Sequence, residues 1–451
     1  MAKLQWFHIP NYTMKCRLYP NAEAAAAIDA AIYAVQCYHN CVLWDLFNNL
    51  ANTIEKEEKK KKSASNVETL PAKSTVEESG PRKVHFPDYK AIFSAAYKAK
   101  LTEEHPAIAN APAAAITSNV GLKADLIKEL GKLPIEYQKP NYYHKSHPRR
   151  SYTYQETFSK IRAGSNPKVF YITLAKVGEI KVRGWNPGIR FDEAGVVDFL
   201  QYAMEHPKER FSITVSKDNC GDYFICFKLS DVFKQFAEIP DKQVGVDVGL
   251  RHIAIQSDGK KYPNKRFKEA AADHHKALNQ QMSRRQGWAN IDFRKEHKRN
   301  PELQVSKSYE RTKLKLAKLD RKTARRRANW NHKVSHDIVA ENGLIAVETL
   351  SVAQMFQDSE IANALGDAAM SDELGMLVYK SGWYQRDLRQ ADQHFPSTQI
   401  CNHCGYQNTK LRDSLPETWK CPCCGSINDI DINAAKNLLE NVLEAEKEGV
   451  V

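Results

Sequence analysis

Four cysteines near the end of the chain stand at a spacing that can bind one metal ion. They form two CxxC pairs: Cys401, Cys404, Cys421 and Cys424. Such pairs give four thiolates in a tetrahedron, a ligand set that Zn²⁺ prefers. Gly405 and Gly425 each follow the second cysteine of a pair and permit the knuckle turn. We predict one structural Zn²⁺, because four thiolates leave no open position for water, with Cys423 in place of Cys424 as an alternative register.

Three carboxylates in distant parts of the sequence are candidates for a second kind of metal site. Asp247 lies within the apolar run 244–250, where an unpartnered charge is costly to bury. Glu348 stands near the end of a second apolar run, 343–350, and Asp431 opens the C-terminal helix. Alone, each acid has an ordinary explanation, namely a strand-end turn, an exposed glutamate and a helix cap. Together they follow the order in which an RNase H-like fold gathers acids around two metal ions.

The chemistry of such a site is phosphodiester hydrolysis. Two Mg²⁺ ions about 4 Å apart can activate a water molecule and stabilise the leaving oxygen. Mg²⁺ prefers hard oxygen ligands, whereas the thiolates would take Zn²⁺, so the chain would hold two metals with separate roles. The elements that must position the acids are a strand at 244–250, a later strand at 343–350 and a C-terminal helix with one buried face.

Two basic segments are candidates for binding nucleic acid, because cations neutralise phosphates and aromatic rings stack on bases. Residues 140–154 interleave cations with aromatic side chains: Tyr142, Tyr143, Lys145, Arg149, Arg150 and Tyr152. Residues 311–333 hold ten Lys or Arg against one acid, on a helical pattern that includes four arginines: Arg321, Arg325, Arg326 and Arg327. The alternatives are a solvated loop with tyrosines packed against a sheet, and a helix merely solvated by its lysines.

The N-terminal half predicts a helical part and a β part. Residues 28–46 carry an apolar stripe at helical spacing, and a helical pattern returns from residue 89 to about 130. Residues 54–80 are charged and polar, which predicts a mobile loop. From 168 to 229 the period changes to two, with a hairpin signal at 218–221, and predicts a small antiparallel barrel.

Composition narrows the class of protein. The chain has 451 residues and a formal net charge of +12, which favours a polyanionic partner. No run approaches the roughly 18 apolar residues that a membrane span needs. Five of the ten cysteines lie between Cys401 and Cys424, and the others show no disulfide spacing. This pattern indicates metal binding in a reducing compartment, and we predict a cytoplasmic protein.

The motifs resemble the TnpB family of transposon-associated RNA-guided nucleases and their relatives, the compact type V CRISPR effectors. Residues 246–249, 346–350 and 429–435 are similar to the three RuvC motifs, and residues 395–405 resemble the zinc ribbon entry. Residues 15–20, 151–154 and 174–183 look like parts of the wedge barrel. The chain departs from the family at 385–392, which is polar where an apolar strand is usual, and in a longer charged linker at 56–80.

The resemblance implies an α+β multidomain fold with an RNase H-like (RuvC) nuclease domain, an inserted zinc ribbon and a small antiparallel β-barrel (wedge) carrying an inserted helical recognition domain. The implied domains are the first wedge strand (1–21), the recognition domain (22–140) with a mobile linker (54–85), the wedge barrel (141–240), the RuvC domain (241–395) with a basic helical insertion (267–335), the ribbon (396–427) and the C-terminal RuvC helix (428–451).

The resemblance also implies a function. Its catalytic acids fall on Asp247, Glu348 and Asp431, which would bind two Mg²⁺, with Asp429 a neighbour rather than a ligand. The implied partners are a guide RNA and a target double-stranded DNA, cut next to a short duplex motif by a monomer or a homodimer. The alternatives are an RNA-guided DNA-binding repressor that does not cut, and an RNA-free resolvase or transposase of the same fold.

Overall fold

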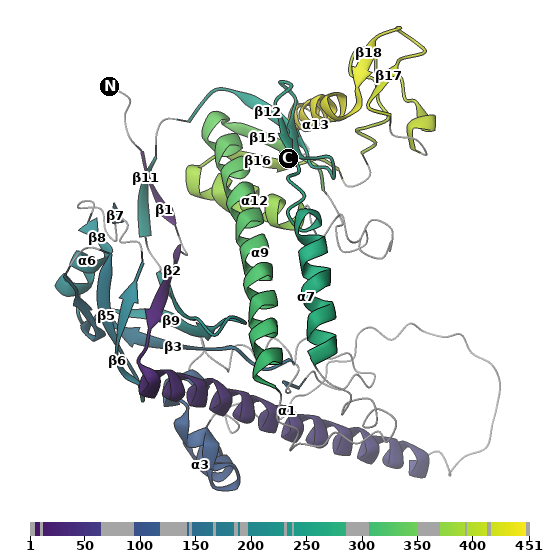
Figure 1. The fold of residues 1–451 in the computed structure, drawn as a ribbon. Coiled ribbons are helices and arrows are strands. Elements are labelled where there is room, and N and C mark those ends of the chain that lie inside the picture. Colours follow the sequence, from purple (N-terminus) through teal and green to yellow (C-terminus); the bar gives the residue numbers. More distant parts are fainter. Residues whose placement is uncertain are drawn as a thin grey trace. The chain divides into compact units, whose positions relative to one another are not determined.

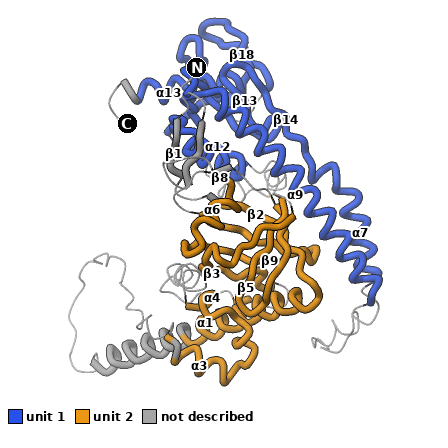
Figure 2. Tube along the Cα trace, turned by 90° about the vertical axis from the view of Figure 1, so that its left-hand side faces the viewer, with its two compact units in different colours: residues 1–7, 234–451 blue, residues 8–233 orange. Residues whose placement is uncertain are grey.

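The chain forms two compact units, which we describe separately. The computed structural model describes residues 5–9, 12–64, 94–117, 142–143, 147–165, 168–184, 188–189, 197–229, 232–236, 239–285, 306–349, 370–392, 395–412 and 416–447. Unit 1 consists of Met1–Phe7 and Lys234–Val451, and unit 2 of His8–Phe233 (Figure 2). No helix within these ranges is long and apolar enough to cross a membrane.

Unit 2 is built on a seven-stranded antiparallel sheet with the order β3-β9-β10-β2-β6-β5-β4. Its strands are β2 (Tyr12–Tyr19), β3 (Ser151–Thr157), β4 (Ile161–Ala163), β5 (Val169–Leu174), β6 (Gly178–Arg183), β9 (Arg210–Lys217) and β10 (Tyr223–Leu229). The predicted hairpin is confirmed: Asp218 accepts hydrogen bonds from the backbone of Cys220 and Asp222, and Gly221 takes a φ of 81°. The antiparallel pairing agrees with the period-two pattern, while closure into a barrel stays a prediction.

The helices of unit 2 pack beside this sheet. They are α1 (Ala22–Ala64), α3 (Ala95–Glu104), η1 (Pro106–Asn110), α4 (Ala113–Thr117) and α6 (Phe199–Glu205). The apolar stripe of α1 is buried as predicted, with Ile28 and Val35 at 0% exposure. The predicted loop at 54–80 is wrong for its first part, because α1 continues to Ala64. In the sequence of this part, Glu is followed by Lys four residues later, a spacing that stabilises an isolated helix. The remainder of that segment lies outside the described residues.

Unit 1 is built on a five-stranded mixed sheet with the order β14-β13-β12-β15-β16. The strands are β12 (Gln243–Asp247), β13 (His252–Gln256), β14 (Lys261–Pro263), β15 (Leu344–Val347) and β16 (Asp387–Gln390). β12, β13 and β14 pair antiparallel, whereas β15 runs parallel to β12 and β16 parallel to β15. β16 is the short, half-exposed edge strand that the polar residues 385–392 form, because an edge strand needs only one buried face.

Helices cover both faces of this sheet (Figure 1). α9 (Lys307–Glu341) and α12 (Met370–Tyr384) bury Val334, Ile338 and Leu377 against Val244 and Val246 of β12. α13 (Ile430–Lys447) packs on the opposite face, where Leu438 and Val442 meet Ala346. α7 (Ala272–Arg285) lies beside α9. Successive strand residues therefore face different helices, as the period of two requires.

The remaining elements are short. They are β1 (Gln5–Ile9) paired with β11 (Val232–Phe236), β7 (Gly188–Ile189) paired with β8 (Val197–Asp198), β17 (Thr418–Lys420) paired with β18 (Ile427–Asp429), η2 (Phe158–Lys160), η3 (Glu269–Ala271) and η4 (Thr409–Arg412).

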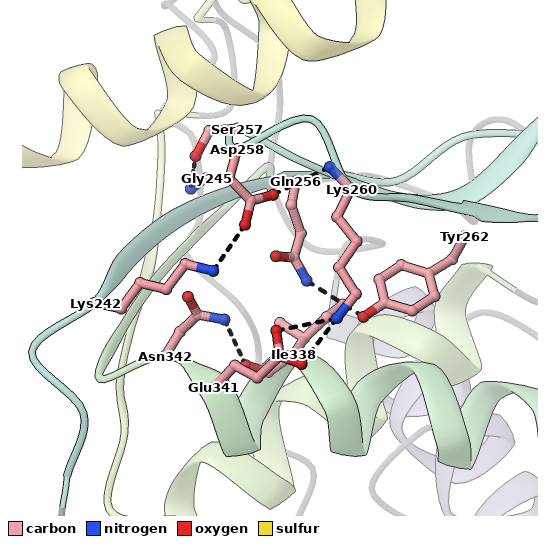
Figure 3. A network of polar contacts seen from close by, with 10 residues as sticks. All are labelled: Lys242, Gly245, Gln256, Ser257, Asp258, Lys260, Tyr262, Ile338, Glu341 and Asn342. Carbon is pink, nitrogen blue, oxygen red and sulfur yellow. Dashed lines mark hydrogen bonds and ion pairs between the residues drawn. The ribbon is translucent and has the colours of Figure 1, made fainter.

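A polar network locks the sheet of unit 1 to the end of α9 (Figure 3). Lys260 donates to both carboxylate oxygens of Glu341 at 2.8 and 3.0 Å, and Lys242 donates to Asp258 at 2.7 Å. The buried Gln256 approaches the Tyr262 hydroxyl at 3.5 Å. Lys242 and Asp258 lie beside the start of β12, whereas Gln256 of β13 pairs with Val246, the residue before Asp247, so the network supports β12 along its length.

One buried carboxyl in unit 1 predicts a pH-dependent stability. Glu373 of α12 is fully buried, and among the described residues no hydrogen-bond partner faces either oxygen. Burial raises its pKa from the usual 4.5 to about 8, although Lys380 opposes the shift. Between these values the folded protein holds a proton that the unfolded chain has lost, so the free energy of unfolding falls as pH rises. We expect this contribution, on the order of a few kcal/mol, to be fully lost above pH 8.

The Glu373→Gln variant should remove this pH dependence and melt at a higher temperature than the wild type above pH 8. Thermal melts between pH 5 and 9 check this, with the exposed Glu440→Gln of α13 as the control. If the melting temperatures of Glu373→Gln and of the wild type change with pH in parallel, Glu373 keeps an ordinary pKa in the folded protein.

Candidate active site and zinc ribbon

The strand alternation directs the predicted acids of unit 1 to one face of the sheet. Gly245 and Asp247 alternate with Val244 and Val246, so Asp247 points to the face that α13 covers. Glu348 follows β15 two residues after Ala346, which contacts α13. Because β12 and β15 are parallel neighbours, the two acids lie at the same end of the sheet, where both strands end. Asp431 lies in the first turn of α13.

The three acids raise the local negative charge. The Asp247 side chain is 8% exposed. Burial, and then the charges of Glu348 and Asp431, raise the pKa of Asp247 from 3.8 to about 8, against one backbone N–H donated by Val248. Burial also raises the pKa of Glu348. A carboxylate held among carboxylates is stabilised by a cation, and an all-oxygen donor set fits Mg²⁺.

Asp429 and Asp431 have different surroundings. Asp429 caps α13, because its Oδ1 accepts a hydrogen bond from the Ile432 N–H at 3.1 Å, and its Oδ2 pairs with Lys261 at 2.6 Å. Burial would raise the pKa of Asp429, but Lys261 and the Ile432 N–H lower it below its usual value. Asp431 instead faces His252, whose Nδ1 lies 3.9 Å from its Oδ2. Sequence reasoning missed both His252 and Lys261, since their only signal is the strand register that brings them to α13.

Close packing of α13 on β12 depends on Gly245. A Cβ at this position would lie 1.8 Å from the Ala435 carbonyl oxygen and 3.1 Å from the Leu439 nitrogen. These are backbone atoms of α13, so they cannot move without displacing the helix that carries Asp431. We expect Gly245→Ala to lower the free energy of unfolding by about 3 kcal/mol or more.

The matched control is Gly375→Ala on α12, where an added Cβ meets nothing within 4 Å. Alanine is the better helix former, so this variant should be neutral or stabilised by up to about 1 kcal/mol. Urea unfolding of both variants checks the prediction. Equal stability of Gly245→Ala and wild type would show that α13 does not approach β12 this closely.

The four predicted zinc ligands lie together in unit 1. The four Sγ atoms of Cys401, Cys404, Cys421 and Cys424 all lie within 4.8 Å of one another. No other group of three or more histidine, cysteine or acidic residues in the described part of the chain is gathered so tightly. Gly405 and Gly425 take φ values of 71° and 74°, as the knuckle turns require. The cluster fits a zinc site, and it includes Cys424, leaving Cys423 outside.

The ribbon around these cysteines has a small core and hydrogen bonds to sulfur. Cys401, Leu411, Trp419, Cys421 and Ile430 form one buried cluster. The Asn428 side chain donates to the Cys401 sulfur at 3.6 Å, and Ser426 lies 3.1 Å from the Cys424 sulfur. Such contacts stabilise thiolates and hold them in place for a metal.

The predicted nucleic-acid residues of unit 2 are only partly accessible. Tyr142 and Tyr143 are half-buried, and the Asn40 side chain of α1 pairs with both backbone groups of Tyr143. Arg150 is exposed, whereas Arg149 is buried and donates to the Ser151 carbonyl. Tyr152 is a correction to the prediction, because its ring is 0% exposed inside β3 and cannot stack on a base. Lys145 lies outside the described residues.

The predicted basic helix is confirmed as part of α9. Arg325 and Arg326 are exposed, while Arg321 and Arg327 are half-buried. Arg326 lies over the Phe267 ring at 4.7 Å. Arg327 lines a groove of about 940 Å³ between α7 and α9, together with Lys268, Lys276 and Arg284.

Two family models match separate parts of the chain. Residues 224–359 match the OrfB_IS605 model, described as "Probable transposase". Residues 374–438 match the "Cas12f1-like, TNB domain" model, which covers all four cysteines.

The curated relatives agree with these two family models. A "Putative RNA-guided DNA endonuclease" of Streptomyces pristinaespiralis is 31% identical over 238 residues, covering 52% of this chain and 54% of the relative. A protein of the same description in Mycobacterium tuberculosis is 29% identical, covering 44% and 42%. Escherichia coli InsQ, which also bears it, is 21% identical, covering 60% and 70%. The chain spans about half the length of the first two relatives.

Solved structures are similar only at a low level. A Cas12f1–sgRNA–target DNA complex matches 96% of this chain and 99% of that chain, at 14% identity and a TM-score of 0.29. The mini-RNA-guided endonuclease CRISPR-Cas_phi3 matches 96% and 92%, at 12% identity and a TM-score of 0.33.

The fold and the cysteine cluster define an α+β protein with a zinc-binding, TNB-type region near its C-terminus. The family models and the relatives confirm the resemblance that the motifs predict. Separate parts of the chain are similar to the TnpB/IS605 OrfB family and to Cas12f-like proteins.

Proposed function

We propose that this protein is an RNA-guided, Mg²⁺-dependent DNA endonuclease with a single RuvC-type active site, which cuts target DNA next to a short duplex motif. The observation that supports the proposal is the buried carboxyl of Asp247, whose pKa is raised by burial and by the charges of Glu348 and Asp431. Keeping Asp247 buried among carboxylates destabilises the metal-free fold, so a cation-binding role explains its presence better than a structural one.

The sheet of unit 1 supports the nuclease class. Three antiparallel strands followed by two parallel strands, in the order β14-β13-β12-β15-β16, is the arrangement of RNase H-like folds. The names of the relatives support guidance by RNA and action on DNA.

In this proposal Asp247 and Asp431 flank the Mg²⁺ ions and Glu348 completes the site. Bound Mg²⁺ supplies a polarised water and charge stabilisation at the phosphate. Asp247 is buried and the other two acids are half-buried, so their charges are less screened by solvent than those of exposed groups. The exposed Arg325 and Arg326 of α9 lie in the same unit and offer cations to a phosphate backbone. Zn²⁺ holds the ribbon together and takes no part in cleavage.

The proposed partners are a guide RNA and target double-stranded DNA. Base pairing would supply sequence specificity, while the protein recognises the hybrid and the adjacent motif. A second candidate is an RNA-free resolvase or transposase, which the description of the OrfB model favours. A guided repressor without cleavage is the third, and the three acids argue against it.

The test is purification of the full chain from a host that expresses its neighbouring non-coding DNA. We expect a copurifying RNA, and Mg²⁺-dependent cutting of a plasmid that carries a sequence complementary to that RNA. Cutting without RNA would support the resolvase or transposase. RNA-dependent binding without any cutting would support the repressor.

A further inference from the structure

The zinc ribbon is directly joined to the helix that carries Asp431. β18 of the ribbon ends at Asp429, and α13 begins at Ile430, whose side chain belongs to the ribbon core. We propose that the ribbon positions Asp431 for metal binding, and that Asn433 and Asn437 are the positioning residues that connect the two. This inference rests on the proposed function, because it takes Asp431 to be a ligand of the catalytic metal.

Asn433 and Asn437 hold the segment that leads into the first zinc knuckle. Asn433 is 3% exposed, accepts from the Asn402 N–H at 2.9 Å and donates to the Ile400 carbonyl at 2.6 Å. One turn later, Asn437 is 2% exposed and donates to the carbonyls of Ser397 and Ile400, both at 2.7 Å. The Asn437 Oδ1 also accepts from the Asn402 side chain at 3.2 Å. Cys401 therefore lies between two residues that are bound to α13: Ile400, whose carbonyl accepts from both asparagines, and Asn402, whose N–H donates to Asn433.

The second half of the ribbon holds the first residue of the same helix. β17 pairs with β18 in the register Thr418 to Asp429, and the Ile430 N–H donates to the Glu417 carbonyl at 3.0 Å. Cys421 follows β17 directly. Residues on both sides of Asp431 are therefore tied to a zinc knuckle, one side through the strand pairing and the other through Asn433 and Asn437.

Within the described part of the chain, few side-chain contacts orient the carboxylate of Asp431. Its contact with His252, at 3.9 Å, is longer than a hydrogen bond. Its direction thus depends on the backbone of the first turn of α13. A buried amide that loses its hydrogen-bond partners destabilises the fold, so the two asparagines resist any rotation of that turn relative to the ribbon.

The experiment measures Mn²⁺ binding to the full chain by electron paramagnetic resonance, because Mn²⁺ binds the same oxygen ligands as Mg²⁺. Only binding that Asp431→Asn abolishes is counted as specific. We expect Asn433→Ala and Asn437→Ala to bind this specific Mn²⁺ about 10-fold more weakly or worse, as loss of supporting contacts around a metal ligand does. Zinc content should stay at one per chain. Lys436→Ala, exposed on the same helix, is the matched control and should bind as wild type does.

Two further arms separate positioning from packing. Asn437→Leu fills the same space without hydrogen bonds, so it should bind Mn²⁺ as weakly as Asn437→Ala, and wild-type binding in this variant overturns the proposal. Removal of zinc from the wild type with a chelator should weaken specific Mn²⁺ binding, and unchanged binding also overturns it. If Asp431→Asn leaves Mn²⁺ binding unchanged, the proposed active site is wrong. If Asp431→Asn abolishes binding but the variants at Asn433 and Asn437 bind Mn²⁺ as the wild type does, only the positioning role is wrong.

Discussion

Replacing Asp247 with Asn should reduce DNA cleavage by at least about 10³-fold, on the order of 4 kcal/mol of transition-state stabilisation. The asparagine has the same shape but cannot supply the charge that holds a catalytic Mg²⁺. Guided DNA binding should be unchanged, because the acid site is not what recognises the hybrid. Cleavage of a matched plasmid and a gel-shift assay with the same DNA check both expectations.

The same substitution should make the metal-free protein more stable. The Asp247 carboxyl is buried beside Glu348 and Asp431, which raises its pKa to about 8, so near pH 9 it is charged and destabilising. Asn carries no charge, and at pH 9 Asp247→Asn should therefore melt at a higher temperature than the wild type in a buffer without Mg²⁺. Asp258→Asn, which removes a half-exposed carboxylate paired with Lys242, is the control and should still cut DNA. A less stable Asp247→Asn protein that still cuts would show that Asp247 is a structural residue.

Replacing Cys404 with Ser should release the zinc ion and unfold the ribbon. Structural Zn²⁺ contributes an apparent binding free energy of about 10–16 kcal/mol in small domains, so three thiolates cannot hold the site as four do. The ribbon core consists of few side chains, two of them zinc ligands, and cannot fold without the metal. Cleavage should be lost with it, because Asp431 follows the ribbon strand β18 directly.

Cys423→Ser is the matched control for this experiment. Cys423 and Cys404 are both exposed, but Cys423 lies outside the four-sulfur cluster. We expect this variant to keep one zinc per chain by elemental analysis and to resist proteolysis as the wild type does. Zinc loss in Cys423→Ser together with retention in Cys424→Ser would reverse the assignment of the fourth ligand.

Features that depend on nearby residues could be predicted from the sequence. The two CxxC pairs, each followed by glycine, need only a knuckle turn to bring their sulfurs together, and the structure brings them together. The stripe on α1 and the hairpin at Asp218 follow from spacings of a few residues in the same way. The individual acids were also visible, because a carboxylate inside an apolar run costs free energy wherever that run folds.

Only the tertiary structure decided which of these residues meet and which way they point. Asp247 shares a face with α13 because β12 and β15 are parallel in one particular register, and a slip of one residue would turn it toward α9. Long-range packing likewise buried Tyr152 and aligned Asn433 with the ribbon. Local geometry can be predicted from the sequence. The convergence of distant side chains depends on how strands pair and helices pack, and the spacing of neighbouring residues does not determine that.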